Sequence, residues 1–121
     1  MNWTQILLFA AALALFFLLR RMGQISASAA REHLKNGAVV VDVRTQGEHA
    51  AGHLPQAILL PLDRIEAALP MRVRDKSTIL LLYCQSGVRS GIAKRKVRAL
   101  GYTQVFNLGS MARASRIVAQ K

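Results

Sequence analysis

At 121 residues the chain has room for one domain, and its composition is unusual in being both 52% hydrophobic and strongly basic, with 17 lysines and arginines against 6 acids. The single cysteine excludes an intramolecular disulfide. The basic excess suits anionic partners, but we expect no nucleic-acid binding, because the sequence has no aromatic stacking platform and no recognised reading motif.

The hydrophobic excess is concentrated at the start of the chain. Residues 3–19 carry no charge, and residues 6–19 are wholly apolar. As a helix the uncharged run would rise about 25 Å, a little less than the thickness of a hydrocarbon core, about 30 Å. Snorkelling arginines and modest thinning of the bilayer could cover this difference in length. We therefore predict that residues 1–22 form an uncleaved transmembrane anchor that contacts the membrane through residues 3–19.

Two other interpretations of this stretch are less favourable. A cleaved signal peptide needs basic residues before the apolar run, whereas here Arg20 and Arg21 follow it. A buried core helix would have to be covered on all sides, which a domain of about 100 residues cannot do. The arginines at the carboxyl end predict a single-pass protein of a bacterial-type inner (plasma) membrane, with the remaining residues, 23–121, on the cytoplasmic side.

Helical and strand patterns alternate in the rest of the chain. Ser26 is a predicted N-cap for a helix over residues 27–36, and residues 38–43, apolar except for Asp42, predict a buried strand. The pattern continues with a strand over 58–60, a helix over 62–69, a strand over 104–108, and a final helix that packs Ala112, Ile117 and Val118. This alternation predicts a small α/β domain whose mostly parallel sheet is covered on both faces.

The central stretch is a continuous apolar run, residues 78–83, followed by a helical pattern over residues 92–100. The run predicts a strand buried on both faces. Cys84, the only cysteine, lies between this strand and the helix. This places a thiol at the carboxyl end of a buried strand, where open α/β sheets hold their binding crevices.

The turn after Cys84 favours a reactive thiolate. Backbone N–H groups from Gln85 to Ser90 can point inward if Gly87 curls the chain, and the positive end of the next helix adds to the same field. A thiol there should ionise more readily than a free cysteine, and Arg89 supplies a charged fork suited to an oxyanion. We predict Cys84 as the catalytic nucleophile. The predicted substrate-binding residues are Gln85, Ser86, Gly87, Val88 and Arg89.

The loop resembles that of the rhodanese, or thiosulfate sulfurtransferase, family, whose C-x-x-G-x-R pattern is matched from Cys84 to Arg89. Further matches occur in the family's order at Val41-Asp42-Val43-Arg44, Glu48, Gly52-His53-Leu54-Pro55, Pro61-Leu62, Gly101-Tyr102 and 105–109. The resemblance implies a three-layer rhodanese-like α/β domain. The chain departs from the family at Ser110, where a second glycine is usual, and it lacks a tryptophan that often follows.

The resemblance implies a sulfurtransferase that takes sulfane sulfur from an anionic donor such as thiosulfate. Cys84 would carry the sulfur as a persulfide and pass it to a thiol or protein acceptor, without a metal or organic cofactor. A membrane-tethered persulfide carrier or binding module with little turnover is the alternative, since it needs the same loop. A phosphatase or arsenate reductase of related fold is disfavoured, because cysteine phosphatases place five residues, not four, between cysteine and arginine.

Other polar residues receive structural interpretations. Asp42 and Arg44 are assigned no catalytic role, and an internal ion pair such as Arg44 with Glu48 is preferred. His49 and His53 are four apart, but Gly52 and Pro55 argue against a helix there, and we predict no metal site. A basic cluster near the loop would attract anionic sulfur donors or rest against anionic lipid. It consists of Arg89, Lys94, Arg95, Lys96 and Arg98.

Overall fold

The computed structural model describes residues 2–120, without the side chains of residues 20–22. Residues 1 and 121, which bound the two predicted segments, lie outside this range, as do the arginine side chains that predicted the membrane orientation. The elements, in chain order, are α1 (Trp3–Met22), α2 (Ala27–Lys35), β1 (Val39–Asp42), α3 (Gln46–Ala51), β2 (Ile58–Leu59), α4 (Ile65–Arg72), β3 (Leu80–Cys84), α5 (Val88–Ala99), β4 (Val105–Ser110) and α6 (Met111–Ala119).

The four strands form one parallel sheet in the order β2-β1-β3-β4, which confirms the predicted α/β class. β3 lies in the interior of the sheet, and all five of its residues are buried. The predicted buried apolar strand is confirmed, although it runs from Leu80 to Cys84 and not over residues 78–83. Both of its faces are covered, so apolar side chains are favoured at successive positions.

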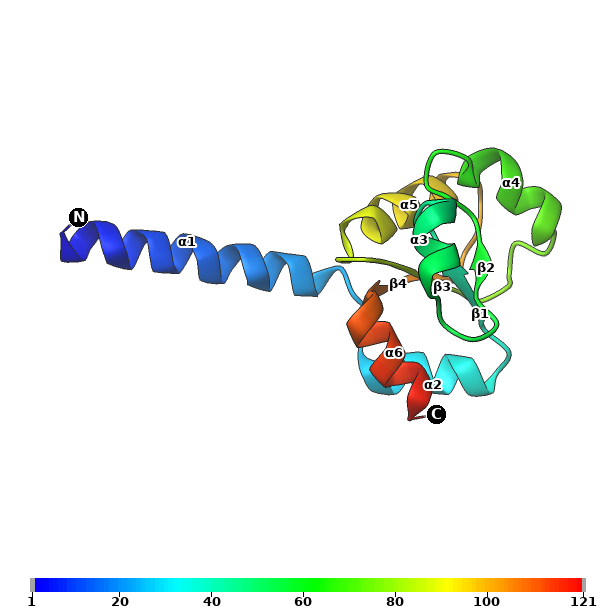
Figure 1. The fold of residues 1–121 in the computed structure, drawn as a ribbon, viewed down its shortest axis with the longest axis horizontal. Coiled ribbons are helices and arrows are strands. Elements are labelled where there is room, and N and C mark those ends of the chain that lie inside the picture. Colours follow the sequence, from blue (N-terminus) through cyan, green and yellow to red (C-terminus); the bar gives the residue numbers. More distant parts are fainter. Residues whose placement is uncertain (1, 121) are drawn as a thin grey trace.

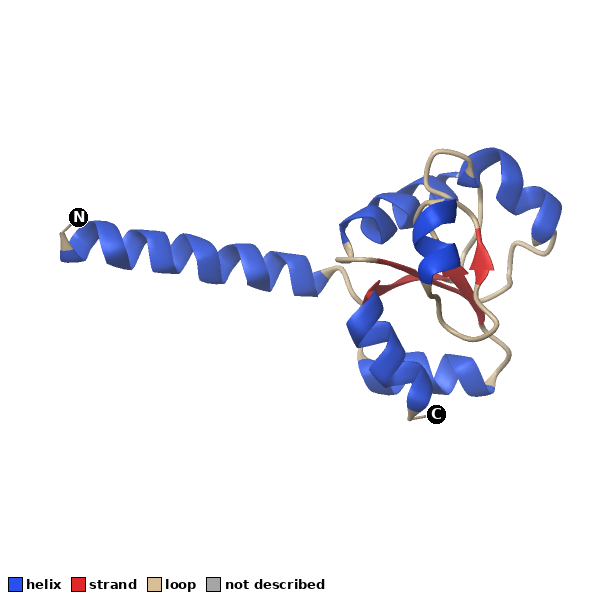
Figure 2. Cartoon of the chain, in the orientation of Figure 1, coloured by secondary structure: helices blue, strands red, loops and turns tan. Residues whose placement is uncertain are grey.

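Helices cover both faces of the sheet, as Figures 1 and 2 show. On one face Leu80, Leu82 and Cys84 of β3 belong to a core cluster with Ala93 and Val97 of α5. The intervening residues of β3 pack with Ala30 of α2 and with Ala114 and Ile117 of α6 in a second cluster on the opposite face. The two-residue period of the strand thus directs Cys84 toward α5.

The predicted helix start at Ser26 is confirmed, because its hydroxyl accepts a hydrogen bond from the Ala29 N–H at 3.2 Å. The prediction that no helix surrounds His49 is wrong. α3 begins after Thr45, whose side chain and backbone form a capping box with Glu48. Gly52, used against a helix, is instead its C-cap.

Two further helices start elsewhere than predicted. α4 begins at Ile65, not at residue 62, and continues through Pro70 to Arg72. α5 begins at Val88, four residues before the predicted start. Gly87 is its N-cap with φ of 94°, a conformation that glycine adopts without strain, so the helix follows directly on the loop.

The prediction of a membrane anchor is wrong. α1 forms a helix whose large apolar side chains are exposed as far as Leu19, and it extends away from the sheet in Figure 1. Yet no helix in the described part of the chain is both long enough and apolar enough to cross a membrane. The uncharged run rises only about 25 Å against a hydrocarbon core of about 30 Å, and the prediction depended on closing that gap. The predicted inner-membrane location, and with it the cytoplasmic orientation, is therefore wrong as well.

Candidate active site

The loop after β3 holds the thiol of Cys84 in a set of hydrogen-bond donors. The sulfur accepts hydrogen bonds from the Gly87 N–H at 3.0 Å and the Ser90 N–H at 3.4 Å. The Ser90 hydroxyl also lies 3.5 Å from the sulfur. The residue is buried, with 0% of its surface exposed. These donors form an amide cradle of the kind that stabilises negative charge on sulfur.

The electrostatic balance at Cys84 has two opposing causes. Burial raises the pKa of the thiol, because it disfavours the charged form. Hydrogen bonds from the Ser90 hydroxyl and N–H, and from the N–H groups of Ser86 and Gly87, lower it by more, so the pKa lies below its ordinary value. The site is therefore suited to a thiolate, which is the nucleophilic form of cysteine.

The buried side chain of Asn107, on β4, supports the cradle from behind. Its amide nitrogen donates to the Gly87 carbonyl at 3.0 Å. Its amide oxygen accepts hydrogen bonds from the Ser90 hydroxyl at 2.6 Å and from the Gly109 N–H at 2.9 Å. Asn107 thus links the turn of the loop, the first turn of α5 and the end of β4.

The side-chain roles of Ser90 and Asn107 were missed from the sequence, although the Ser90 N–H was among the predicted loop donors. Ser90 directly follows the loop arginine, in the first turn of the helix, and that position was a usable signal. Asn107 is a polar residue within a strand that is otherwise largely apolar, and it is only 4% exposed. A buried polar side chain must find partners, so this placement was the available signal for a structural hydrogen-bond network.

Arg89 forms a two-fold contact with Glu48 of α3. Its guanidinium donates to both carboxylate oxygens, at 2.7 and 2.9 Å, and both side chains are about one-third exposed. Hydrogen bonds from Arg89 and from Thr45 lower the pKa of Glu48 to about 2. The arginine predicted to bind an anion therefore already has a carboxylate as its partner.

Arg44 pairs with Asp42, so the predicted Arg44–Glu48 pair does not form. Its guanidinium reaches both oxygens of Asp42, at 3.0 and 2.9 Å, in a buried ion pair. It also donates to the side-chain oxygen of Gln85 at 3.2 Å and to the carbonyl of Gly52 at 2.6 Å. Arg44 thus ties the first residue of the loop to the end of α3.

His49 and His53 stack with ring centroids 3.7 Å apart, and Nδ1 of His49 lies 2.9 Å from Asp42 Oδ2. Within the described residues there is no group of three or more His, Cys, Asp or Glu side chains that could hold a metal ion. The pair therefore belongs to the polar network that surrounds Asp42.

A pocket of about 320 Å³ opens beside the Arg89–Glu48 pair, between the loops that follow β1 and β2. It is lined by Val43, Arg44, Thr45, Pro61, Leu62, Asp63, Arg89 and Lys96. Three of these side chains are cationic and one is acidic. The predicted loop residues are placed unevenly around it: Arg89 lines the pocket, Gly87 donates to the sulfur, and Gln85, Ser86 and Val88 are exposed.

The model of the rhodanese-like domain family matches residues 26–113, which include β1 to β4 and the Cys84 loop. The chain belongs to the rhodanese-like domain family. The solved rhodanese with anions from E. coli is 31% identical, with a TM-score of 0.62, and the match covers 64% of this chain and 91% of that one. A human single-domain sulfurtransferase is 30% identical, with a TM-score of 0.62, over 82% of this chain and 96% of that chain.

Curated relatives of this rhodanese-like chain include a thiosulfate sulfurtransferase, PspE, of Escherichia coli, 34% identical over 59% of this chain and 68% of the relative. A sulfurtransferase of Allochromatium vinosum is 36% identical over 58% of this chain and 64% of the relative. A tRNA uridine(34) hydroxylase of Erwinia tasmaniensis is 35% identical over 59% of this chain, but the match spans only 21% of that protein. The relatives that are named sulfurtransferases support a rhodanese-type transferase, and hence a sulfur donor and an acceptor, in general.

Proposed function

We propose that this protein is a sulfurtransferase that moves sulfane sulfur from an anionic donor, with thiosulfate as the model donor, through a persulfide on Cys84. We propose residues 23–121 as the domain that does this. The observation that carries the proposal is the set of N–H groups, from Gly87 and Ser90, that point at the sulfur at the carboxyl end of β3.

In the first step the Cys84 thiolate attacks the outer sulfur of thiosulfate. A bond forms between the cysteine sulfur and the outer sulfur, the sulfur–sulfur bond of thiosulfate breaks, and sulfite leaves with the electron pair. The terminal sulfur of the resulting persulfide carries a negative charge, which the N–H groups of the loop would stabilise in the manner of an oxyanion hole.

In the second step an acceptor nucleophile attacks the terminal sulfur of the persulfide. The sulfur–sulfur bond of the persulfide breaks, and Cys84 is restored as a thiolate. With cyanide as the acceptor the product is thiocyanate. A cellular acceptor would be a thiol of a small molecule or a protein, and no net oxidant or reductant is needed.

Arg89 is proposed to bind the anionic donor, with Glu48 as its partner in the absence of substrate. A donor anion would have to replace the carboxylate at the guanidinium. The pocket beside this pair supports the idea, because two further cations, Arg44 and Lys96, line it together with Arg89. Asp42 and Glu66 pair with these two cations and offset part of their charge.

The test is the intact mass of the reduced full chain after thiosulfate treatment. We expect a gain of one sulfur atom that cyanide removes, with thiocyanate released, and no gain in the Cys84→Ser variant. Absence of an adduct on the folded, reduced protein would refute transfer from thiosulfate, and an adduct retained by the Cys84→Ser variant would refute Cys84 as the carrier.

A persulfide carrier with little turnover is the second candidate. It is favoured by two observations, the complete burial of Cys84 and the engagement of Arg89 by Glu48, both of which would slow a free small-molecule donor. Repeated release of thiocyanate with excess thiosulfate and cyanide would support the enzyme. A single release per protein molecule would support the carrier.

A further inference from the structure

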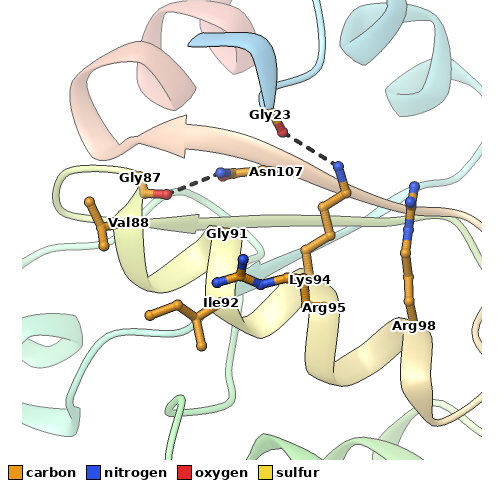
Figure 3. A pocket seen from close by; sticks show the side chains of 9 residues that line it. All are labelled: Gly23, Gly87, Val88, Gly91, Ile92, Lys94, Arg95, Arg98 and Asn107. Atoms are coloured by element: carbon orange, nitrogen blue, oxygen red, sulfur yellow. Dashed lines mark hydrogen bonds between the residues drawn. The ribbon is translucent and has the colours of Figure 1, made fainter. Parts of the chain in front are cut away.

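A second pocket, of about 520 Å³, lies beside the loop on the side of Gly23 and β4. Its lining residues are Gly23, Gly87, Val88, Gly91, Ile92, Lys94, Arg95, Arg98 and Asn107, which Figure 3 shows from close by. Cys84 is not among them. The volume is within the range of small-molecule sites, about 300–1,000 Å³.

The spacing of residues along α5 explains both the shape of this pocket and its charge. Gly91, Lys94, Arg95 and Arg98 follow one another at intervals of three, one and three residues, so they share one face of α5. Gly91 has no side chain to fill the pocket, and the cationic side chains at the other three positions line it. Among the described lining residues there is no acidic side chain.

Two of the three cations are already fixed at the rim. The Lys94 ammonium lies 3.4 Å from the Gly23 carbonyl, as Figure 3 shows, and Arg98 donates to the Val105 carbonyl at 3.0 Å. Arg95 makes no hydrogen bond or ion pair with any described residue, so its N–H donors remain open to a ligand. By contrast, Lys96 on another face of α5 is paired with Glu66 at 3.0 Å.

The positive charge on this face of α5 favours an anionic ligand. Burial, and then the charge of Arg98, lower the pKa of Lys94. No acidic side chain among the described lining residues offsets the three positive charges. An anion with several oxygens could accept hydrogen bonds from the open Arg95 fork and meet the charges of Lys94 and Arg98 at the same time.

We propose that this pocket binds a small polyanion of the phosphate class, carrying two or more phosphate groups, at a site separate from the Cys84 sulfur. A concave pocket of this size accepts a small molecule. More than one phosphate group is expected because Lys94 and Arg98 are separated by about 6 Å along the helix axis. The site does not require sulfur transfer, so its test is independent of the proposed function.

The first test is calorimetric titration of the full chain with inorganic triphosphate at constant ionic strength. We expect saturable binding that the double variant Lys94→Gln, Arg95→Gln weakens by at least about tenfold, the loss expected for one or more charge-assisted hydrogen bonds. The matched control is the double variant Arg72→Gln, Arg74→Gln, which removes the same charge from exposed positions outside the pocket lining. Its affinity for triphosphate should lie within about twofold of that of the parent.

Absence of triphosphate binding by the parent chain would overturn the proposal. Equal weakening in the two double variants would overturn it too, since that result means general charge attraction. Circular dichroism of each variant verifies that it is folded.

A second test needs no variant. On titration with triphosphate, the amide NMR signals of Gly23, Gly91 and Arg95 should shift most. Shifts centred on Thr45 and Leu62 would place the anion in the pocket beside Arg89 instead and would overturn the assignment. Mass analysis of sulfur uptake by Cys84, done separately, tests the proposed function and does not depend on either result.

Discussion

The guanidinium of Arg89 is held by the carboxylate of Glu48 through two hydrogen bonds, of 2.7 and 2.9 Å, although the two residues are 41 positions apart in the chain. Arg89 belongs to the loop that surrounds Cys84, whereas Glu48 belongs to α3 and also caps that helix with Thr45. The pair therefore connects the amino-terminal turn of α3 to the loop that carries the thiol. It makes Glu48 a competitor for any anion that approaches Arg89.

Replacement of Glu48 by glutamine should strengthen the binding of thiosulfate. The variant keeps the shape of the side chain but removes the charge that holds Arg89, so half-maximal persulfide formation should occur at a lower thiosulfate concentration. Intact mass after short exposures to thiosulfate measures this. The control is Glu32→Gln, which removes an exposed carboxylate on α2, outside the lining of the donor pocket. An unchanged or higher half-saturating concentration in Glu48→Gln would contradict competition between Glu48 and the donor.

The same carboxylate should make stability depend on pH in acid. The pKa of Glu48 is about 2 in the folded protein, below its ordinary value of 4.5. A depressed pKa contributes stability that is fully present above the ordinary pKa and is lost as the pH falls through about 2. Urea unfolding between pH 5 and pH 2 should therefore show a steeper loss of stability in the parent and in Glu32→Gln than in Glu48→Gln. Parallel curves of stability against pH for all three proteins would contradict a depressed pKa of Glu48 in the folded state.

Removal of the Ser90 hydroxyl should raise the pKa of the Cys84 thiol. Ser90 lowers that pKa through both its side chain and its N–H group, and Ser90→Ala removes only the side-chain contribution. The pH dependence of thiolate absorbance in the ultraviolet measures the shift. Ser77→Ala, at an exposed serine far from the loop, should leave the pKa unchanged. A pKa that stays the same in Ser90→Ala would mean that the N–H groups alone set the ionisation of the thiol.

Asn107 should matter for both stability and reaction. Asn107→Leu keeps the branched shape of the side chain but replaces the amide by methyl groups. It leaves the Gly87 carbonyl and the Gly109 N–H without their partner, at a cost of about 3 kcal/mol in the free energy of unfolding. Urea unfolding measures that cost. In the fraction that stays folded, persulfide formation should slow, because Gly87 is less firmly held against the sulfur. A cost below about 1 kcal/mol, with normal sulfur uptake, would refute a positioning role for Asn107.

The local sequence determined the parts of the molecule that depend on neighbouring residues. The uninterrupted apolar run that ends at Cys84 predicted a strand buried on both faces, and β3 is such a strand. Alternating strand and helix patterns predicted the α/β class, and Ser26 predicted the start of α2. These features depend on local backbone geometry and on the spacing of side chains within one element. They can therefore be predicted without knowing which elements pack together.

The tertiary structure decided the partners. Parallel pairing of β1 with β3 brings the loops after both strands to one edge of the sheet, and there Arg44 pairs with Asp42 while Glu48 pairs with Arg89. Pairing of β3 with β4 likewise brings Asn107 beneath the turn at Gly87. Charge type and spacing showed that ion pairs would form near the loop, but not which ones. The choice between two arginines and two carboxylates depends on distances that exist only after the sheet has assembled.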